Sequence, residues 1–224
     1  MPNDPISITL LIAILVISLG VHEAAHAWVA YRCGDSTAKD LGRMTLNPIV
    51  HIDLFMTILL PMLLIFIQAP FLFGGAKPVP VAFHRLRHPW RDMSLVAIAG
   101  PASNFLLAIL FALIHKLSFT VFGMEPDPTG YSYQILPAVM QGAVLFNLVL
   151  AAFNLVPIPP LDGSRVLAWL LPESLRHTYV QIERYGMLVI IGLLYFGAFR
   201  MILLPMVITM EDWVYSIVTL GGLW

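Results

Sequence analysis

Two histidines and a glutamate near the start of the chain have the spacing of a metal-dependent hydrolase site. They stand in the pentapeptide HEAAH, an H-E-x-x-H pattern made by His22, Glu23 and His26. Residues four apart lie on one face of a helix, so both imidazoles can point at a single ion. Two histidines and a third ligand suit tetrahedral zinc and leave one position for water. Glu23 would lie beside such an ion rather than on it, which is where a general base is needed.

The helix that carries this motif is expected to lie in a membrane. Residues 6–31 form an apolar stretch in which Glu23 is the only charged side chain. An unpaired carboxylate at membrane depth costs about 2 to 3 kcal/mol or more, so such a residue usually marks a functional site. H-E-x-x-H strings also arise by chance in soluble helices, where the side chains are merely solvated. The apolar setting favours the metal site over that reading.

The composition of the whole chain is typical of a polytopic membrane protein. Of 224 residues, 59% are hydrophobic and only 11% are charged, whereas soluble proteins have about 25% charged residues. The formal net charge is -1 at pH 7, and the sequence contains no basic run. A lipid bilayer is therefore the expected surrounding, and a nucleic-acid partner is excluded.

Three further apolar runs are long enough to cross a bilayer, which takes about 20 helical residues. They predict helices at 94–115, 132–155 and 186–210, followed by a C-terminal segment at 211–224. With the first helix, these runs make at least four spans. The expected fold is a membrane all-α bundle of about four to six transmembrane segments in a single integral-membrane domain, 1–224.

The region 41–83, between the first two predicted spans, has a different pattern. Its apolar run 54–69 is short for a span and has cationic residues on both sides. It is therefore expected to be re-entrant, or to cross and return at once. The following segment 74–81 has two glycines and two alternating prolines, which exclude a helix. The region thus predicts a re-entrant, extended β-like element that lines a cavity in the protein.

The charges that flank the first helix predict its orientation. Arg32, Lys39 and Arg43 follow the helix, whereas only Asp4 precedes it. By the positive-inside rule, the N-terminus lies outside and the HEAAH end faces the cytoplasm. The expected location is the cytoplasmic membrane, with several crossings.

A two-histidine site needs a third ligand, and Asp162 is the candidate. It follows three prolines and precedes Gly163 in the sequence NLVPIPPLDG, so it stands at the end of a broken helix, in a loop and short helix at 156–171. An ordinary helix N-cap is the alternative role for this aspartate. Asp162 reaches the level of His26 only if the run 54–69 makes no net crossing, so re-entrance and metal ligation support each other.

Several motifs together resemble the site-2 proteases, which are intramembrane zinc metalloproteases. The resemblance covers nearly the whole chain and rests on HEAAH, on GPASN at 100–104, on NLVP at 154–157 and on LDG at 161–163. The segments GRMTLNP at 42–48 and AKPVP at 76–80 are similar to the compact prokaryotic branch, which has no PDZ or nucleotide-sensing domain.

This resemblance implies a zinc metalloendopeptidase and assigns roles to particular residues. It implies one zinc ion per chain with His22, His26 and Asp162 as ligands and with Glu23 as the catalytic base. Single-span membrane proteins are the implied substrates.

Two asparagines match family positions that help to position the substrate or to stabilise the reacting peptide. They are Asn104 and Asn154. Hydrogen bonding between helices is an equally good interpretation of both, because polar side chains join helices inside membranes.

Two other functions are compatible with polar residues in an apolar chain. One is a transporter of zinc or another divalent ion, since intramembrane His, Glu and Asp residues can also form a transit site. The concentration of these residues near one membrane face argues against it. The other is an inactive scaffold that binds membrane helices, for which the base Glu23 would be unnecessary. The sequence encodes neither a cleavage preference nor an oligomeric state.

Overall fold

In the part of the chain that the structure describes, four long helices are each apolar and long enough to span a membrane. A computed structural model describes residues 5–69, 74–120 and 135–219. The long helices are α1 (Pro5–Arg32), α4 (Pro89–Thr120), α5 (Ile135–Leu155) and α9 (Ala198–Thr219). Helices satisfy every backbone hydrogen bond within one segment, which a lipid environment requires. The prediction of a membrane all-α fold is confirmed, and the described ranges contain no strand.

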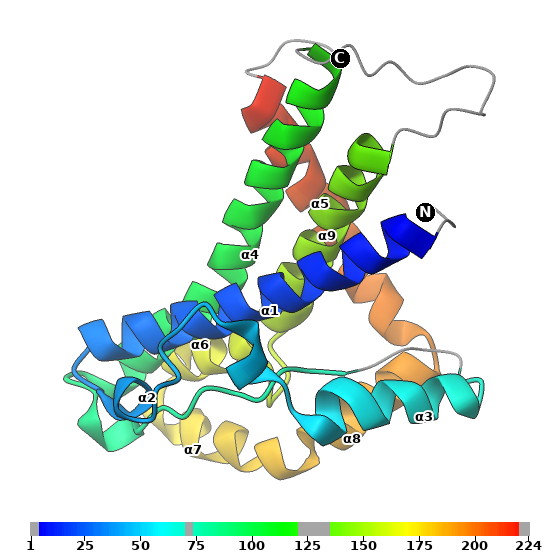
Figure 1. Ribbon diagram of the computed structural model, residues 1–224. Coiled ribbons are helices and arrows are strands. Elements are labelled where there is room, and N and C mark those ends of the chain that lie inside the picture. Colours follow the sequence, from blue (N-terminus) through cyan, green and yellow to red (C-terminus); the bar gives the residue numbers. More distant parts are fainter. Residues whose placement is uncertain (1–4, 70–73, 121–134, 220–224) are drawn as a thin grey trace.

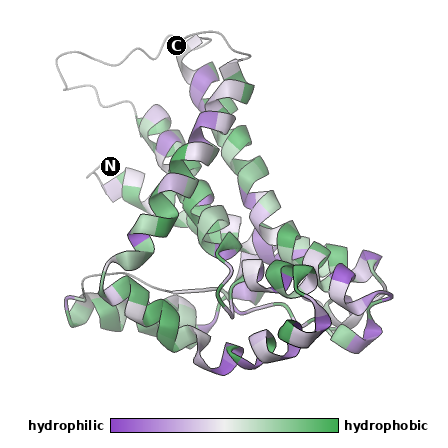
Figure 2. Cartoon of the chain, turned by 180° about the vertical axis from the view of Figure 1, so that it is seen from behind, coloured by the Kyte–Doolittle hydropathy of each residue, from purple (hydrophilic) through white to green (hydrophobic). Residues whose placement is uncertain are grey.

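The short elements gather at one end of the bundle (Figure 1). The short helices are α2 (Thr37–Asp40), α3 (Leu60–Phe66), α6 (Asp162–Leu170), α7 (Glu173–Gln181) and α8 (Glu183–Tyr195). Hydrophilic residues are frequent in α2 and α7, whereas α3 and most of α8 are hydrophobic like the long helices (Figure 2). This end of the molecule therefore combines polar chemistry with irregular backbone.

The helices α4 and α5 form the centre of the bundle, with α1 on one side and α9 on the other. Small residues let α4 and α5 approach α9 closely, as is usual between membrane helices. The buried core between these three helices consists of Ala108, Ala112, Val144, Leu148, Ala152, Val207, Val214 and Val218. It holds the α4–α5 pair in place as the frame for the opposite side.

The region between α1 and α4 begins and ends at the same end of the bundle (Figure 1). A 3-10 turn (Pro48–His51), a π-helical segment (Leu54–Leu59) and α3 are followed by the extended chain 74–82. Because the region returns to its starting level, α4 leads from this end of the bundle to the opposite end, and α5 leads back to it. Asp162 consequently comes back to the level of His26, as the sequence argument required.

Side chains and two backbone hydrogen bonds, rather than a neighbouring strand, hold the extended segment in place. The guanidinium of Arg43 donates to the carbonyl oxygens of Lys77 and Pro78, at 2.7 and 2.9 Å. The buried carboxylate of Asp35 accepts the backbone N–H of Ala82 at 2.6 Å. Burial alone would raise the pKa of Asp35, but hydrogen bonds from Thr37 and Ala82 outweigh burial and keep this pKa below its usual value.

The C-terminal part of the chain differs from the prediction of one helix over 186–210. Two helices, α8 and α9, replace it, and α9 continues to Thr219 through most of the expected C-terminal segment 211–224. Gly197 has a φ of 70° and donates its N–H to the carbonyl of Leu194. This left-handed glycine ends α8, as glycines at helix C-termini commonly do. The hydropathy of the run continues across the break, so composition alone did not reveal it.

Candidate metal centre

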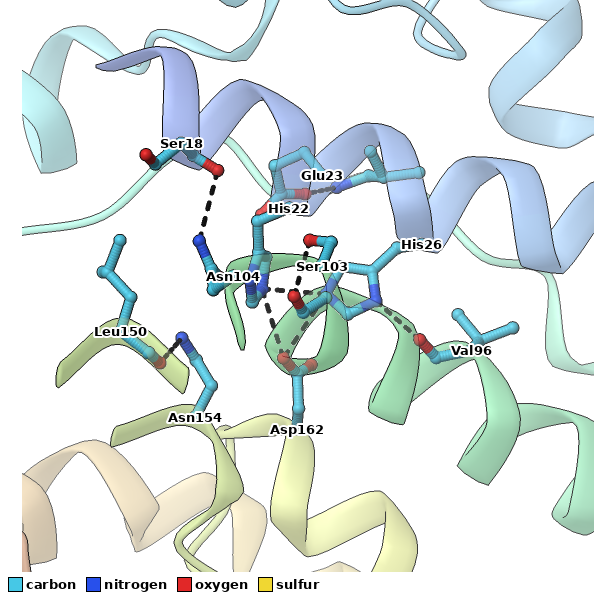
Figure 3. Close-up of polar contacts among 12 residues, drawn as sticks. Ser18, His22, Glu23, His26, Val96, Ser103, Asn104, Leu150, Asn154 and Asp162 are labelled. Atoms are coloured by element: carbon cyan, nitrogen blue, oxygen red, sulfur yellow. Dashed lines mark hydrogen bonds and ion pairs between the residues drawn. The ribbon is translucent and has the colours of Figure 1, made fainter. Parts of the chain in front are cut away.

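Three side chains from two elements meet at the polar end of the bundle (Figure 3). His22 and His26 come from α1, and Asp162 comes from the first turn of α6. The Oδ2 atom of Asp162 lies 3.3 Å from Nε2 of each histidine, and the two Nε2 atoms are 3.0 Å apart. Both histidines are buried. The structure thus brings together the three residues that the sequence named as metal ligands.

The outer nitrogens of the two rings make hydrogen bonds that determine where the ring hydrogens are. Nδ1 of His26 lies 2.7 Å from the carbonyl oxygen of Val96, which can only accept. Nδ1 of His22 lies 2.6 Å from the amide oxygen of Asn104. Each Nδ1 therefore donates, and in the neutral ring each Nε2 keeps a free lone pair.

The inner atoms of the cluster repel one another unless a cation lies between them. Two lone pairs and a carboxylate oxygen converge, and Oδ2 of Asp162 is buried without a hydrogen-bond partner. Burying such an oxygen without compensation is costly. Two imidazole nitrogens with one carboxylate oxygen form a donor set that suits zinc. The residues present fit this metal.

Two glycines stand where the chain packs too closely for a side chain, and one of them lies directly against the cluster. A Cβ on Gly100 of α4 would lie 2.5 Å from Nε2 of both His22 and His26. A Cβ on Gly163 would overlap the carbonyl group of Leu155. Both positions therefore require glycine, which explains the glycines of the GPASN and LDG motifs.

The local structure of Asp162 bears on its two possible roles. The N-cap of α6 is Leu161, and Asp162 is the first residue of the helix. The Asp162 carboxylate points at the histidines (Figure 3). Its position does not support the N-cap alternative, and it is suitable for ligation.

Glu23 lies beside the cluster and does not belong to it. Its Oε2 accepts the backbone N–H of Val79, in the extended segment, at 2.8 Å. The same carboxylate lines a cavity of about 330 Å³ that the extended segment partly covers. The cavity wall comprises His22, Glu23, His26, Pro78, Val79, Val81, Met93, Val96, Ala97, Asn154, Pro160, Asp162 and Arg165.

The two asparagines that the sequence paired have different positions. Asn154 lines the cavity, and its Nδ2 donates to the carbonyl of Leu150 in its own helix, at 3.0 Å. Asn104 is fully buried behind His22. Of the two, Asn154 is the one that can face a substrate, while Asn104 acts on the ring of His22.

Sequence reasoning overlooked three further residues at this centre. Asn147 and Ser18 are fully buried and connect to Asn104, while Arg165 lines the cavity and pairs with Glu183 at 2.6 Å. Asn147 stands seven residues before Asn154 and Ser18 four before His22. Polar residues at these helical spacings from motif residues, inside apolar spans, were the available signal.

Comparisons with known proteins agree with this centre. The family model of peptidase family M50 matches residues 10–125 and 124–197. YwhC of Bacillus subtilis, which carries the name of a zinc metalloprotease, is 40% identical over 185 residues, 82% of this chain and 78% of its own length. No solved structure matches the chain.

More distant relatives have similar names. Rip2 of Mycolicibacterium smegmatis, also named as a zinc metalloprotease, is 31% identical over 83% of this chain and 66% of its own length. Zinc metalloprotease MJ0392 of Methanocaldococcus jannaschii is 24% identical over 77% of this chain and 37% of its own length. These matches select the peptidase over the transporter and the scaffold. The chain belongs to peptidase family M50, the site-2 protease family, and is a multi-pass membrane zinc metalloprotease.

Proposed function

We propose that the protein hydrolyses peptide bonds of membrane-spanning substrates with one zinc ion held by His22, His26 and Asp162. The observation that carries this proposal is the convergence of two imidazole Nε2 atoms and one carboxylate oxygen at a cavity wall, with the Nδ1 atom of each ring at hydrogen-bonding distance from an oxygen. When bound, zinc supplies a Lewis acid for the scissile carbonyl and for water.

Glu23 is the general base in this proposal. Its carboxylate shares the cavity with the ligands without joining them, so it can take a proton from the attacking water and pass it to the leaving amide nitrogen. The N–H of Val79 holds one oxygen, Oε2, in place. The other oxygen of Glu23 is the one that we assign to proton transfer.

The substrates are single-span membrane proteins that unwind locally at the cavity. In a helix, every peptide N–H and C=O is hydrogen-bonded and shielded, so a membrane helix must open before hydrolysis. The extended segment with Pro78, Val79 and Val81 lines the cavity and is held by side chains. We assign this segment to alignment of an unwound substrate, with Asn154 as a polar contact at the same wall.

The charge distribution supports an active site on the cytoplasmic side of the cytoplasmic membrane. Cationic residues concentrate in the segments at the metal end, between α1 and α4 and in α6 to α8. At the other end, Lys116 contacts the carbonyl of Val218 in α9, and α9 itself carries the acidic Glu211 and Asp212. By the positive-inside rule, the metal end faces the cytoplasm and the N-terminus lies outside.

The catalytic proposal is tested with purified protein and a single-span substrate. We expect one zinc per wild-type chain and a cleavage site inside the substrate's membrane segment, located by mass spectrometry. Glu23→Gln keeps the size and hydrogen-bonding capacity of the side chain, so this variant should retain zinc and lose cleavage by about 100- to 10,000-fold. Cleavage by Glu23→Gln at the wild-type rate would remove Glu23 as the base, and a zinc-free active wild type would refute the site.

The orientation is tested separately with Cys33, the single cysteine of the chain. Cys33 directly follows α1 at the metal end. A membrane-impermeant maleimide should leave it unlabelled in intact cells and label it after permeabilisation. Labelling in intact cells at the permeabilised level would reverse the proposed orientation.

A further inference from the structure

A chain of buried polar side chains continues from the metal centre into the helix bundle. Nδ1 of His22 contacts Oδ1 of Asn104 at 2.6 Å, and Nδ2 of Asn104 donates to Oδ1 of Asn147 at 3.0 Å. Nδ2 of Asn147 then donates to Oγ of Ser18 at 3.1 Å and to the carbonyl of Ala143 at 2.9 Å. Ser18, Asn104 and Asn147 are fully buried, and Figure 3 shows the Ser18 and Asn104 end of this chain beside His22.

The hydrogen bonds of this chain can point in only one direction. The carbonyl of Ala143 accepts and cannot donate, so Asn147 must turn its amide nitrogen toward Ala143. The amide oxygen of Asn147 then faces Asn104, which must present its own nitrogen there. The oxygen of Asn104 is left facing His22, and Nδ1 of His22 must carry the hydrogen.

Without Asn147, only one contact still favours that orientation of the Asn104 amide, the approach of its Nδ2 to the backbone carbonyl of Ser18 at 3.5 Å, the limit of hydrogen-bonding distance. A flipped amide would present nitrogen to His22 and would donate to Nδ1. The ring hydrogen would then move to Nε2, the atom that faces Asp162 and His26. An Nε2 that carries hydrogen cannot bind a metal.

We propose that Asn147 is a positioning residue that acts through Asn104 to keep Nε2 of His22 free of hydrogen and available to zinc. The inference rests on the proposed function, in which His22 is a zinc ligand. It assigns to α5 a role at the metal centre beyond packing. The competing role is simple adhesion between α4 and α5, for which asparagines are also suitable.

The first measurement is the zinc affinity of the metal-free protein in detergent, by competition with a chelator. Changes in the partners of metal ligands typically weaken metal binding by about 10- to 100-fold. Asn147 is one contact farther away, so Asn147→Leu should weaken zinc binding about tenfold. Ser18→Ala removes one acceptor and leaves Ala143 in place, so it should weaken binding less than Asn147→Leu does. Wild-type affinity in Asn147→Leu would overturn the inference.

The second measurement separates positioning from adhesion with a double-mutant cycle on zinc affinity. If Asn147 acts through Asn104, then Asn147→Leu should cause no further loss in a protein that already has Asn104→Leu. A loss that adds fully to that of Asn104→Leu would show a general structural effect and would also overturn the inference.

Controls distinguish this inference from the proposal on which it depends. Ser118→Ala removes another buried hydroxyl of α4, which bonds within its own helix to the carbonyl of His115, and should leave zinc affinity unchanged. Thermal unfolding of each variant in detergent shows whether it is folded. If His22→Ala binds zinc as tightly as wild type, the ligand assignment fails and the inference fails with it. If His22→Ala loses zinc while Asn147→Leu does not, only the inference fails.

Discussion

The two sides of the central α4–α5 pair are built in different ways. On the α1 side, buried polar atoms meet at hydrogen-bonding distance, from His22 through Asn104 to Asn147. On the α9 side, the buried core consists of alanines, valines and a leucine, and a polar contact, from Lys116 to the carbonyl of Val218, lies at its edge. The same two helices thus carry a directional network on one face and an apolar contact on the other.

We infer that the α1 side mainly determines the geometry of the metal centre, whereas the α9 side mainly determines the stability of the fold. Hydrogen bonds between membrane helices contribute only about 0.6 kcal/mol on average, but they fix which atoms face each other. Apolar packing has no such direction, yet each removed side chain leaves a cavity that costs energy. We therefore expect changes on the α1 side to affect zinc and catalysis, and changes on the α9 side to affect unfolding.

The largest effect is expected from Asp162→Ala on the α1 side. Zinc contributes several kcal/mol of transition-state stabilisation, so loss of a ligand should reduce cleavage by about a thousandfold or more. Bound zinc measured by metal analysis should fall with it. Asp212→Ala, at an exposed carboxylate of α9, is the matched control and should retain both. Full zinc and full activity in Asp162→Ala would remove this residue from the site.

The next effect is expected from Gly100→Ala, which adds one carbon against both Nε2 atoms. Displacement of catalytic groups by about 1 Å can cost roughly 100-fold, so we expect cleavage to fall by about this factor. Zinc affinity should fall as well. Gly192→Ala is the control, because its new Cβ meets no atom within 4 Å. Equal activity in the two variants would mean that α4 does not constrain the histidines.

Leu148→Ala tests the apolar side of the comparison. Leu148 is fully buried in the core that faces α9, and its truncation should reduce the free energy of unfolding by about 2 kcal/mol or more. Zinc affinity should stay within the error of the wild-type value. Chemical denaturation in detergent measures the first quantity, with Leu106→Ala, at a largely exposed position of α4, as the control. A selective loss of zinc binding in Leu148→Ala would break the separation of the two sides.

The smallest effect is expected from Glu183→Gln, which removes a polar contact that is not fully buried. The ion pair of Arg165 and Glu183 has about a third of each side chain exposed, and such pairs contribute less than about 1 kcal/mol. Unfolding measured at low and high salt should differ little between variant and wild type. A loss above about 2 kcal/mol would show that polar contacts at this end stabilise the fold even without burial.

Local spacing was enough to predict the parts of the site that lie within one segment. The spacing of four positions from His22 to His26 places both rings on one face of any helix, because the helical repeat is 3.6 residues. The apolar lengths predicted the spans α1, α4 and α5, and the charges and prolines predicted a returning segment that brings Asp162 to the histidines. The break at Gly197 was not predictable in this way, because hydropathy does not change across it.

Contacts between segments were decided only by the tertiary structure. Asn104 lies 82 residues from His22 and Asn147 lies 43 residues from Asn104, so no spacing rule connects them. Sequence motifs suggested the same role for Asn104 and Asn154. Packing places Asn104 behind the ligand His22 and Asn154 at the cavity wall. HEAAH by itself determined which atoms could bind a metal. Which tautomer those rings adopt, and what covers the cavity, depends on how α4, α5 and the extended segment pack around α1, because hydrogen-bond direction is set by the neighbours that packing supplies.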